Sequence, residues 1–435
     1  MNSAAARWPT KRLRFLTAIP QKGEIGGVPD ETEVSFVPME AIGENGQIET
    51  SRTKAIAEVR NGYSYFAEGD VVLAKITPCF ENGKGAIAKH LVNDVGFGTT
   101  ELHVIRVGPG LDARFLFYVT KSHPFRKLGE AEMYGAGGQK RVPESFVRDF
   151  RVHVPGLDEQ RVIADFLDRE AAKIDDLVDC KSTLLRQLAD REQALITSAV
   201  CRGLNGSART RATGILWIGD VPEHWELLHL RRVVKKFVDY RGRTPEKVPD
   251  GVPLVTAVNI KNGRIDLSLG QEFMPEADYD EWMVRGLPER GDLLVTTEAP
   301  LGEVAQIEDT RVALAQRIIL LKVKKKKISN EYLKYFFLSA AGQGELWTRA
   351  SGSTALGIKA SRFKGITVIV PPLSEQSAIV DHLDRETSRL GQLKRAVEGS
   401  IPRLSEYRTS LISAAVTGQI DIRNYHPQEA AALCQ

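Results

Sequence analysis

The sequence of 435 residues lacks the features that mark membrane, secreted and metal-binding proteins. Its four cysteines, Cys79, Cys180, Cys201 and Cys434, have no C-x-x-C spacing, which argues against a zinc knuckle or a disulfide framework. No stretch approaches the roughly 18 apolar residues of a membrane span, and charged residues interrupt the apolar runs near the N-terminus. The eight histidines show no metal-ligand spacing. We therefore expect a cytoplasmic protein without a metal site.

Signatures of catalysis are missing as well. The segment "ITPCF" at 76–80 has no acidic or amide residue where an Asn/Asp-Pro-Pro-aromatic methyltransferase motif needs one. The segment "ENGKGAI" at 81–87 has glycine after its lysine, where a phosphate-binding loop requires serine or threonine. Both segments are interpreted as loops, so we expect a chain that is not an enzyme and binds no cofactor of its own.

The net charge of +3 is small, but it is unevenly distributed. Counting lysine and arginine against aspartate and glutamate, residues 1–157 carry +2, 158–204 carry −3, 205–373 carry +5 and 374–435 carry −1. A polyanion would therefore meet the first and third blocks. The length exceeds what one core usually serves, about 250 to 300 residues, so several domains are expected.

One segment of the chain occurs twice. "PGLDEQRVIADFLDRE" at 155–170 returns as "PPLSEQSAIVDHLDRE" at 371–386. After each proline, Asp158 or Ser374 is placed to cap a helix, and apolar residues then recur at steps of three and four. This pattern predicts two long rods with a coiled-coil seam, the second with a kink or short break near 399–401 because Pro402 lies inside it.

The blocks between the rods resemble each other more faintly. "EGDVVLAKITPCFENGKGAI" at 68–87 and "RGDLLVTTEAPLGEVAQI" at 290–307 both read as a turn, a short strand and a loop with proline and glycine. A strand follows in each block, at 100–107 and at 316–323, and then the start of a short helix. Each block is therefore predicted to be a mixed α/β domain of about 150 residues.

The polar residues that recur on both rods are candidates for docking a partner, because one face presented twice suits two copies of it. Helix capping and solvated charge remain the alternative for each residue alone. The candidates are Glu159, Gln160, Asp168, Arg169 and Glu170 in the first copy, and Glu375, Gln376, Asp384, Arg385 and Glu386 in the second.

The repeated rods, the "GDVVLAKITPCFENGKGA" hairpin and the "GDVPEHWELLHLRRV" opener together resemble the specificity subunit of type I restriction-modification systems over essentially the whole chain. The resemblance implies an α+β fold with two target-recognition domains, separated by two helices that form an antiparallel coiled coil with pseudo-twofold symmetry. It assigns 1–157 and 205–373 to the recognition domains, 158–204 and 374–423 to the rods, and 424–435 to a tail.

The same resemblance implies binding of double-stranded DNA with a two-part target, and assembly with two modification (methyltransferase) subunits and with restriction (translocase and endonuclease) subunits. S-adenosylmethionine, ATP and magnesium would be used by those partners. Two alternatives stay open: a diverged methyltransferase or endonuclease with its own recognition domains, and a coiled-coil adaptor that binds no nucleic acid.

Base contacts call for Arg, Lys, Asn or Gln, and phosphate contacts for Lys, Arg, Ser or Thr, delivered from loops. Each candidate taken alone is also compatible with a solvated loop residue. The candidates in the first domain are Lys75, Thr77, Asn82, Lys84, Gln139, Lys140 and Arg141. Those in the second domain are Arg241, Arg243, Thr244, Asn259, Lys261, Thr296, Thr297, Ser353, Thr354 and Lys359.

Overall fold

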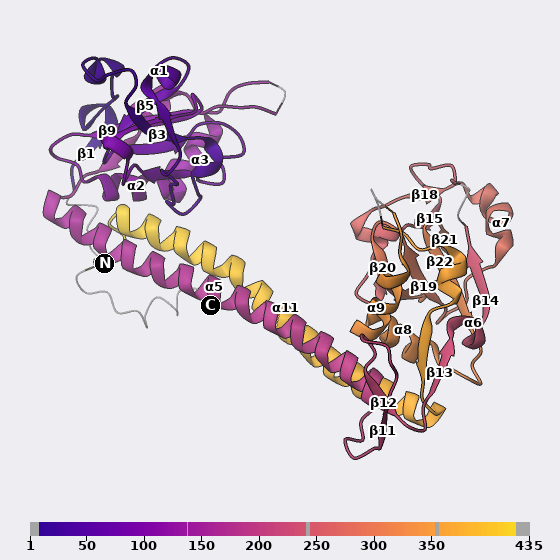
Figure 1. Cartoon of the computed structure of the whole chain (residues 1–435). Coiled ribbons are helices and arrows are strands. Elements are labelled where there is room, and N and C mark those ends of the chain that lie inside the picture. The colour runs from indigo at the N-terminus through magenta and orange to yellow at the C-terminus, as the bar shows by residue number, and fades with distance from the viewer. Residues whose placement is uncertain (1–7, 137, 241–243, 353–355, 423–435) are drawn as a thin grey trace. The chain divides into compact units, whose positions relative to one another are not determined.

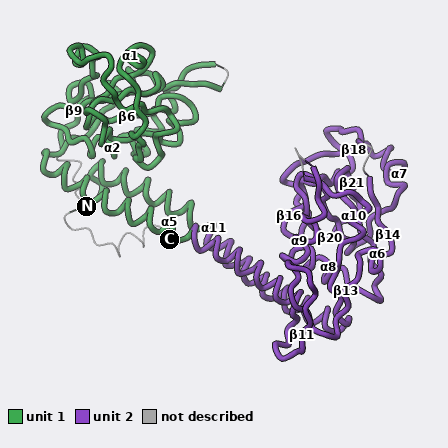
Figure 2. Tube along the Cα trace, viewed as in Figure 1, with its two compact units in different colours: residues 1–181, 398–435 green, residues 182–397 purple. Residues whose placement is uncertain are grey.

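The structure, a computed structural model, describes residues 8–136, 138–240, 244–352 and 356–422. These residues form two compact units, one within 1–181 and 398–435 and the other within 182–397 (Figure 2). Each unit combines a mixed α/β domain with segments of two long helices, α5 (Leu157–Arg202) and α11 (Leu373–Val416) (Figure 1). The predicted α+β class, with two domains and two long rods, is confirmed.

Unit 1 contains two four-stranded sheets and short helices. The first sheet has the order β2-β9-β6-β7 and the second the order β4-β3-β8-β5. The strands of the first sheet are β2 (Thr17–Ala18), β9 (Leu102–Val107), β6 (Val71–Ala74) and β7 (Gly85–Ile87), and those of the second are β4 (Thr53–Ala55), β3 (Glu33–Val37), β8 (Val95–Gly98) and β5 (Ser64–Ala67). Helices α2 (Ala113–Lys121), α3 (His123–Ala131) and α4 (Glu144–Asp149) follow, and β1 (Thr10–Arg12) pairs with β10 (Arg151–His153).

Unit 2 repeats this plan with different residues. Its main sheet has the order β14-β22-β19-β20, and a smaller sheet has the order β18-β15-β21. The strands are β14 (Val234–Asp239), β22 (Ile318–Val323), β19 (Leu293–Thr297), β20 (Leu301–Gln306), β18 (Phe273–Met274), β15 (Val252–Val255) and β21 (Ala313–Leu314). Helices α8 (Asn330–Leu338), α9 (Ala340–Arg349) and α10 (Ala360–Lys364) follow, and β13 (Glu226–His229) pairs with β23 (Thr367–Val370).

The faint sequence similarity between the two blocks therefore corresponds to equivalent strands and helices. The first apolar run of each predicted hairpin forms a fully buried strand, β6 or β19, and its partner along the chain is β7 or β20. The predicted following strand and helix are β9 with α2, and β22 with α8. Continuous apolar runs such as "VVLA" suit strands buried on both faces, which explains why these segments were readable from the sequence.

The two rods lie side by side within each unit. In unit 1, Arg408 on α11 forms an ion pair with Asp175 on α5, and in unit 2 Lys394 pairs with Glu192. Most seam positions are buried, as Ile163, Leu188 and Leu383 illustrate. Two equivalent seam positions differ from the prediction, because Leu177 is 49% exposed and Leu393 46% exposed. The spacing of apolar residues at steps of three and four therefore assigned these two leucines to the seam wrongly.

Two local predictions for the rods are wrong. The helices begin at Leu157 and Leu373, so Asp158 and Ser374 lie inside the first turn instead of capping it. The reason is that Gly156 and Pro372 already supply the first helical carbonyls, which accept from the amides of Gln160 and Gln376. The second prediction was a kink or a short break near 399–401, and the break is absent, because α11 stays helical through the exposed Pro402.

Candidate nucleic-acid interface and rod joints

In unit 1, the loop between β6 and β7 lies against a second, glycine-rich loop. Ile76 and Tyr134 each form an isolated backbone β-bridge with Arg141. The Thr77 amide donates to the Lys140 carbonyl at 2.9 Å. The Lys75 carbonyl accepts from the Val142 amide at 2.8 Å. The structure therefore brings together candidates that are about 60 residues apart in the sequence, at one edge of the domain.

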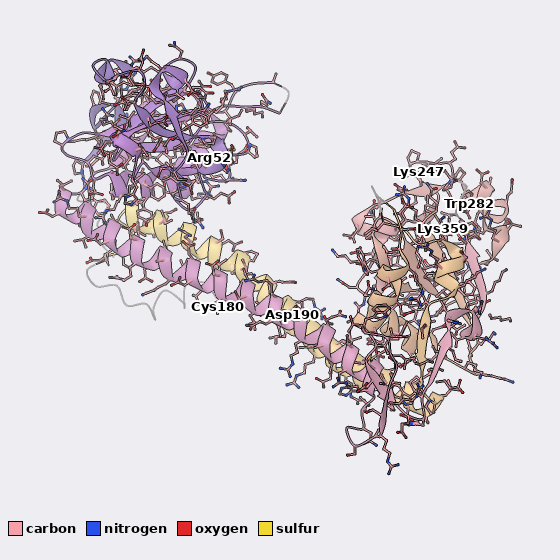
Figure 3. All side chains as sticks on the ribbon, viewed as in Figure 1. Arg52, Cys180, Asp190, Lys247, Trp282 and Lys359 are labelled. Carbon is pink, nitrogen blue, oxygen red and sulfur yellow. The ribbon has the colours of Figure 1, made fainter. Side chains whose placement is uncertain are left out.

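Unit 2 builds the same pair of loops. Glu298 and Ser351 each form a bridge with Gly357, and the Ile358 amide donates to the Thr297 carbonyl at 3.0 Å. Ser351 and Gly357 thus have the places that Tyr134 and Arg141 have in unit 1, while the residue types differ. In Figure 3, Lys359 and Lys247 lie in the half of unit 2 that is farther from its rod segments.

The charged side chain of Arg141 on the unit 1 loop is restrained by an ion pair. Arg141 donates from Nε and Nη2 to the two carboxylate oxygens of Glu101, both at 2.9 Å. These bonds lower the pKa of Glu101 and raise the pKa of Arg141. The bidentate pair restrains the guanidinium plane and uses Nε and Nη2, so Nη1, which approaches the Gln139 carbonyl at 3.4 Å, is the nitrogen left for a ligand.

A hollow of about 750 Å³ lies beside this loop, with Tyr63, Lys75, Tyr134 and Arg141 among its lining residues. Tyr134 is 65% exposed. Neither tyrosine is among the contact residues predicted from the sequence. The signal that points to Tyr134 is an aromatic residue in a glycine-rich polar loop, which suits stacking on an unpaired base.

Other predicted contact residues are accessible to differing degrees. Those that are exposed are Asn82, Gln139, Lys140, Thr244, Lys261 and Lys359. Those that are half-buried are Lys75, Thr77, Lys84 and Arg141, and the Lys84 ammonium donates to the Met39 carbonyl at 3.3 Å. Arg241, Arg243, Ser353 and Thr354 lie outside the described residues.

Three predicted contact residues are closed to a ligand in this structure. Asn259 is 0% exposed, and its side chain bonds Thr256, Asp266 and Gly270. Thr296 is also 0% exposed and accepts from the Glu303 amide at 2.9 Å, and Thr297 is 1% exposed. For these three, the prediction of direct DNA contact disagrees with burial. In this conformation their side chains hold loops together.

The repeated glutamines are turned inward to their own domain. The side-chain Oε1 of Gln160 accepts from the backbone amide of Asp112 at 2.8 Å. Its Nε2 donates to the backbone carbonyls of Gly110 and Pro155 at 3.1 and 2.9 Å. The side chain is 0% exposed. A direct contact of Gln160 with a partner would require it to leave these three bonds.

Gln376 makes the equivalent bonds in unit 2. Its carbonyl accepts from the Ser329 amide at 2.8 Å, and its amino group donates to the carbonyls of Lys327 and Pro371 at 3.0 and 2.8 Å. Ser329 caps α8 as Asp112 caps α2. Each glutamine therefore ties the start of a rod to the start of a domain helix. We call this arrangement the rod joint, made of Gln160 and Asp168 in unit 1 and of Gln376 and Asp384 in unit 2.

The aspartates of the rod joint hold a tyrosine of the same domain helix. The Tyr118 hydroxyl donates to Asp168 at 2.6 Å, and the Tyr335 hydroxyl donates to Asp384 at 2.6 Å. Both tyrosines are 4% exposed, and burial together with the adjacent carboxylate raises the pKa of each. At neutral pH the hydroxyls therefore remain protonated donors.

The remaining docking candidates have mixed surroundings. Glu375 accepts from the Trp225 indole at 3.0 Å and pairs with His224 at 2.7 Å. Glu170 is nearly buried and pairs with Lys173 at 2.8 Å. Arg169 and Arg385 are exposed, while Glu159 and Glu386 are half-buried. Among these remaining candidates the arginines are the exposed ones, and Asp168 and Asp384 of the rod joints are exposed as well.

Two further surveys cover the part of the chain that the structure describes. Within it, no three side chains of His, Cys, Asp or Glu gather as a metal ion would need. None of its helices combines the length with the apolar character required to cross a bilayer.

Comparison with known proteins identifies similar chains. The model of the "Type I restriction modification DNA specificity domain" family matches residues 19–181 and 285–398. The type I restriction enzyme EcoEI specificity subunit of Escherichia coli is 41% identical over 162 residues, which cover 37% of this chain and only 27% of that relative. The EcoKI specificity subunit of E. coli (strain K12) is 21% identical over 420 residues, covering 93% of this chain and 82% of the relative.

Solved structures share the fold. A chain from work on complex assembly and conformational transition of the type I R-M system matches with a TM-score of 0.74 at 17% identity, covering 95% of this chain and 98% of that chain. The HsdS subunit from Thermoanaerobacter tengcongensis matches with a TM-score of 0.55 at 17% identity, covering 95% of this chain and 97% of that chain.

Proposed function

This chain belongs to the family of type I restriction modification DNA specificity domains, and from that premise we propose that it is the subunit that reads a two-part DNA target. Residues 1–157 and 205–373 would each read one half, and rods 158–204 and 374–423 would set the unread spacer, with 424–435 as a tail. The observation that carries the proposal is that both units build the same pair of loops on the same frame with different side chains.

The chain would assemble with two modification (methyltransferase) subunits and with restriction subunits in the cytoplasm. Support for two copies of one partner comes from features that occur at equivalent places on the rods. Leu177 and Leu393 are about half exposed, and Arg169 and Arg385 are exposed beside buried seam residues. Exposed apolar side chains and exposed guanidinium groups are both found at protein interfaces, and here each recurs at the equivalent place of the second rod.

Chemistry would reside in the partners. S-adenosylmethionine would serve the modification subunits, and ATP with magnesium the restriction subunits, while this chain supplies the target. The exposed lysines and the restrained Arg141 suit contacts with phosphates and base edges, whereas no part of the proposal needs a catalytic group on this chain.

The decisive experiment is single-molecule sequencing of methylated adenines in a host with and without this gene. We expect one two-part sequence to be methylated only when the gene is present. Methylation by the purified chain alone with S-adenosylmethionine would favour the enzyme alternative. DNA binding by the assembled complex that does not weaken with rising salt, or no DNA binding, would favour the adaptor alternative, because phosphate contacts release counterions.

A further inference from the structure

We propose that the rod joints are positioning elements that fix the direction of each recognition domain on its own rod and so define the permitted spacer. This inference rests on the proposed function. It assigns the repeated Gln160, Asp168, Gln376 and Asp384 to a task inside the chain. Both glutamines are 0% exposed, and both aspartates, although exposed, accept a hydrogen bond from a buried tyrosine.

Each joint has two attachment points on the rod. Gln160 and Asp168 are eight residues apart on α5, which corresponds to about 12 Å along a helix axis. Gln376 and Asp384 have the same separation on α11. A single attachment would let the domain pivot on the rod. Two separated attachments restrain the angle between the rod and the recognition domain.

The domain side of each joint also has two points, and both lie on one helix. In unit 1 they are the cap residue of α2, Asp112, and Tyr118 six residues later. In unit 2 they are Ser329 and Tyr335 at the matching places of α8. Since α2 and α8 follow directly after β9 and β22 of the main sheets, the direction of each rod is coupled to the sheet that carries the candidate DNA loops.

The hydrogen bonds are of the kind that tolerates little displacement. The glutamine amide uses its oxygen once and its nitrogen twice in both units, so a shift of the rod leaves buried groups unpaired. The tyrosine bonds end on carboxylates and are short, which is typical of charge-assisted bonds.

The two joints differ in the additional contacts around them, and this makes them separable by experiment. In unit 1, Arg114 adds ion pairs to Asp165 at 2.6 Å and Asp168 at 3.0 Å. At the matching place of α8 stands Glu331, which instead accepts from Gln306 at 3.0 Å. Among the described residues of unit 2 no arginine shares Asp384 with the tyrosine, so Tyr335, whose hydroxyl also contacts the Thr387 hydroxyl at 3.3 Å, is the residue to alter.

The test uses the full chain assembled with its modification subunits and synthetic duplexes that carry the target with its native spacer or with one base pair added or removed. The variants are Tyr335→Phe and Gln376→Ala. The matched control is Tyr279→Phe, because Tyr279 is also 4% exposed in unit 2 and its hydroxyl bonds the Val312 carbonyl at 3.4 Å, away from the joint. Asp384→Asn, which keeps an acceptor for the tyrosine, is the conservative variant.

We expect Tyr335→Phe to lower the ratio of methylation rates, native spacer over altered spacer, by about tenfold, since a hydrogen bond to a charged group is lost. Asp384→Asn should retain most of this ratio, and the preference for each half-site should not change. If Gln376→Ala fails to fold, Tyr335→Phe still decides the matter.

A fall in rate that is equal for all spacers would overturn the proposal, because it would show a purely structural role. An unchanged ratio, or the same change in Tyr279→Phe, would overturn it as well. If the wild-type complex methylates no two-part sequence, the proposed function itself is wrong, which is a different result from a wild-type complex whose spacer preference survives the joint variants.

Discussion

Unit 1 and unit 2 share the order of their sheet strands and the bonds of their rod joints, and differ in the side chains of their candidate DNA loops. The main sheets have the same strand order, β2-β9-β6-β7 and β14-β22-β19-β20, and the rod joints make the same bonds. The loops beside them carry Gln139, Lys140 and Arg141 in one unit and different residues in the other. The glutamine and tyrosine bonds of the rod joints are retained in both units, whereas the side chains of the candidate DNA loops differ.

One interior position also differs between the units. Lys121 is the last residue of α2, and Leu338 is the last residue of α8, each followed by a serine that precedes the next helix. The Lys121 side-chain nitrogen is buried and lies within hydrogen-bond distance of the carbonyls of Glu44, Gly83 and Gly85. It thereby holds the turn that carries Asn82 and Lys84. The difference teaches that the units stabilise equivalent loops by different chemistry.

The largest effect is expected from an exchange of the whole second recognition domain, residues 205–373. Replacing residues 205–373 by the corresponding block of a homologue should replace one half of the methylated sequence completely and leave the other half unchanged, because each unit carries its own pair of loops. Sequencing of methylated adenines measures this. A change of both halves, or of neither, would contradict the division of labour.

The next effect concerns the pH dependence of stability. Burial lowers the pKa of Lys121 from 10.5 to about 7. Between these values the unfolded chain binds a proton that the folded chain does not, so the free energy of unfolding should rise with pH from about 7 to 10. We expect a rise on the order of 3 kcal/mol from this residue.

Lys121→Met should remove this rise, as measured by chemical denaturation across that pH range. The matched control is Lys127→Met, because Lys127 is exposed and pairs with Glu130 on the surface. Identical pH profiles for the wild type and Lys121→Met would refute the assignment of the rise to this buried ammonium.

Loss of one glutamine of a rod joint should have a smaller effect. Gln160→Ala leaves the Asp112 amide and two carbonyls without their partner, and should lower the free energy of unfolding by about 2–3 kcal/mol. Gln187→Ala changes the same residue type at an exposed position of α5 and should cost less than about 0.5 kcal/mol. Equal effects in denaturant titrations would mean that the joint does not hold the domain.

The smallest expected effect is at the exposed loop of unit 1. Lys140→Ala should weaken DNA binding about three- to tenfold for all sequences alike and reduce the salt slope of the affinity by about one, as for a phosphate contact. The control is Lys127→Ala on α3. A loss confined to one target sequence would instead identify Lys140 as a base-reading residue, and an unchanged salt slope would remove it from the interface.

Periodic patterns were enough to predict much of the frame. The rods, the strands β6 and β19 and the helices α2 and α8 all stand where the apolar spacing placed them. The prediction of a break at Pro402 failed because local propensity was weighed alone, while α11 stays helical with Leu411 and Ala415 buried against the domain core.

The candidate site was harder to predict because exposure is not a local property. Asn259, Thr296 and Thr297 have the residue types expected of DNA contacts, yet their side chains are buried by segments distant in the sequence. Gln160 and Gln376 were noticed because they repeat, but the repeat alone did not tell whether their partners lie inside the chain or outside it.

The sequence by itself determined the two rods, the two similar α/β domains and the family, because apolar periodicity and a repeated segment are local and need no knowledge of the fold. Only the tertiary structure decided which repeated side chains form hydrogen bonds within the chain. Asp112 and Gln160 are 48 residues apart, and an amide hydrogen bond becomes specific only when its partner is within about 3 Å and water is excluded. That condition is set by packing, which spacing along the chain does not record.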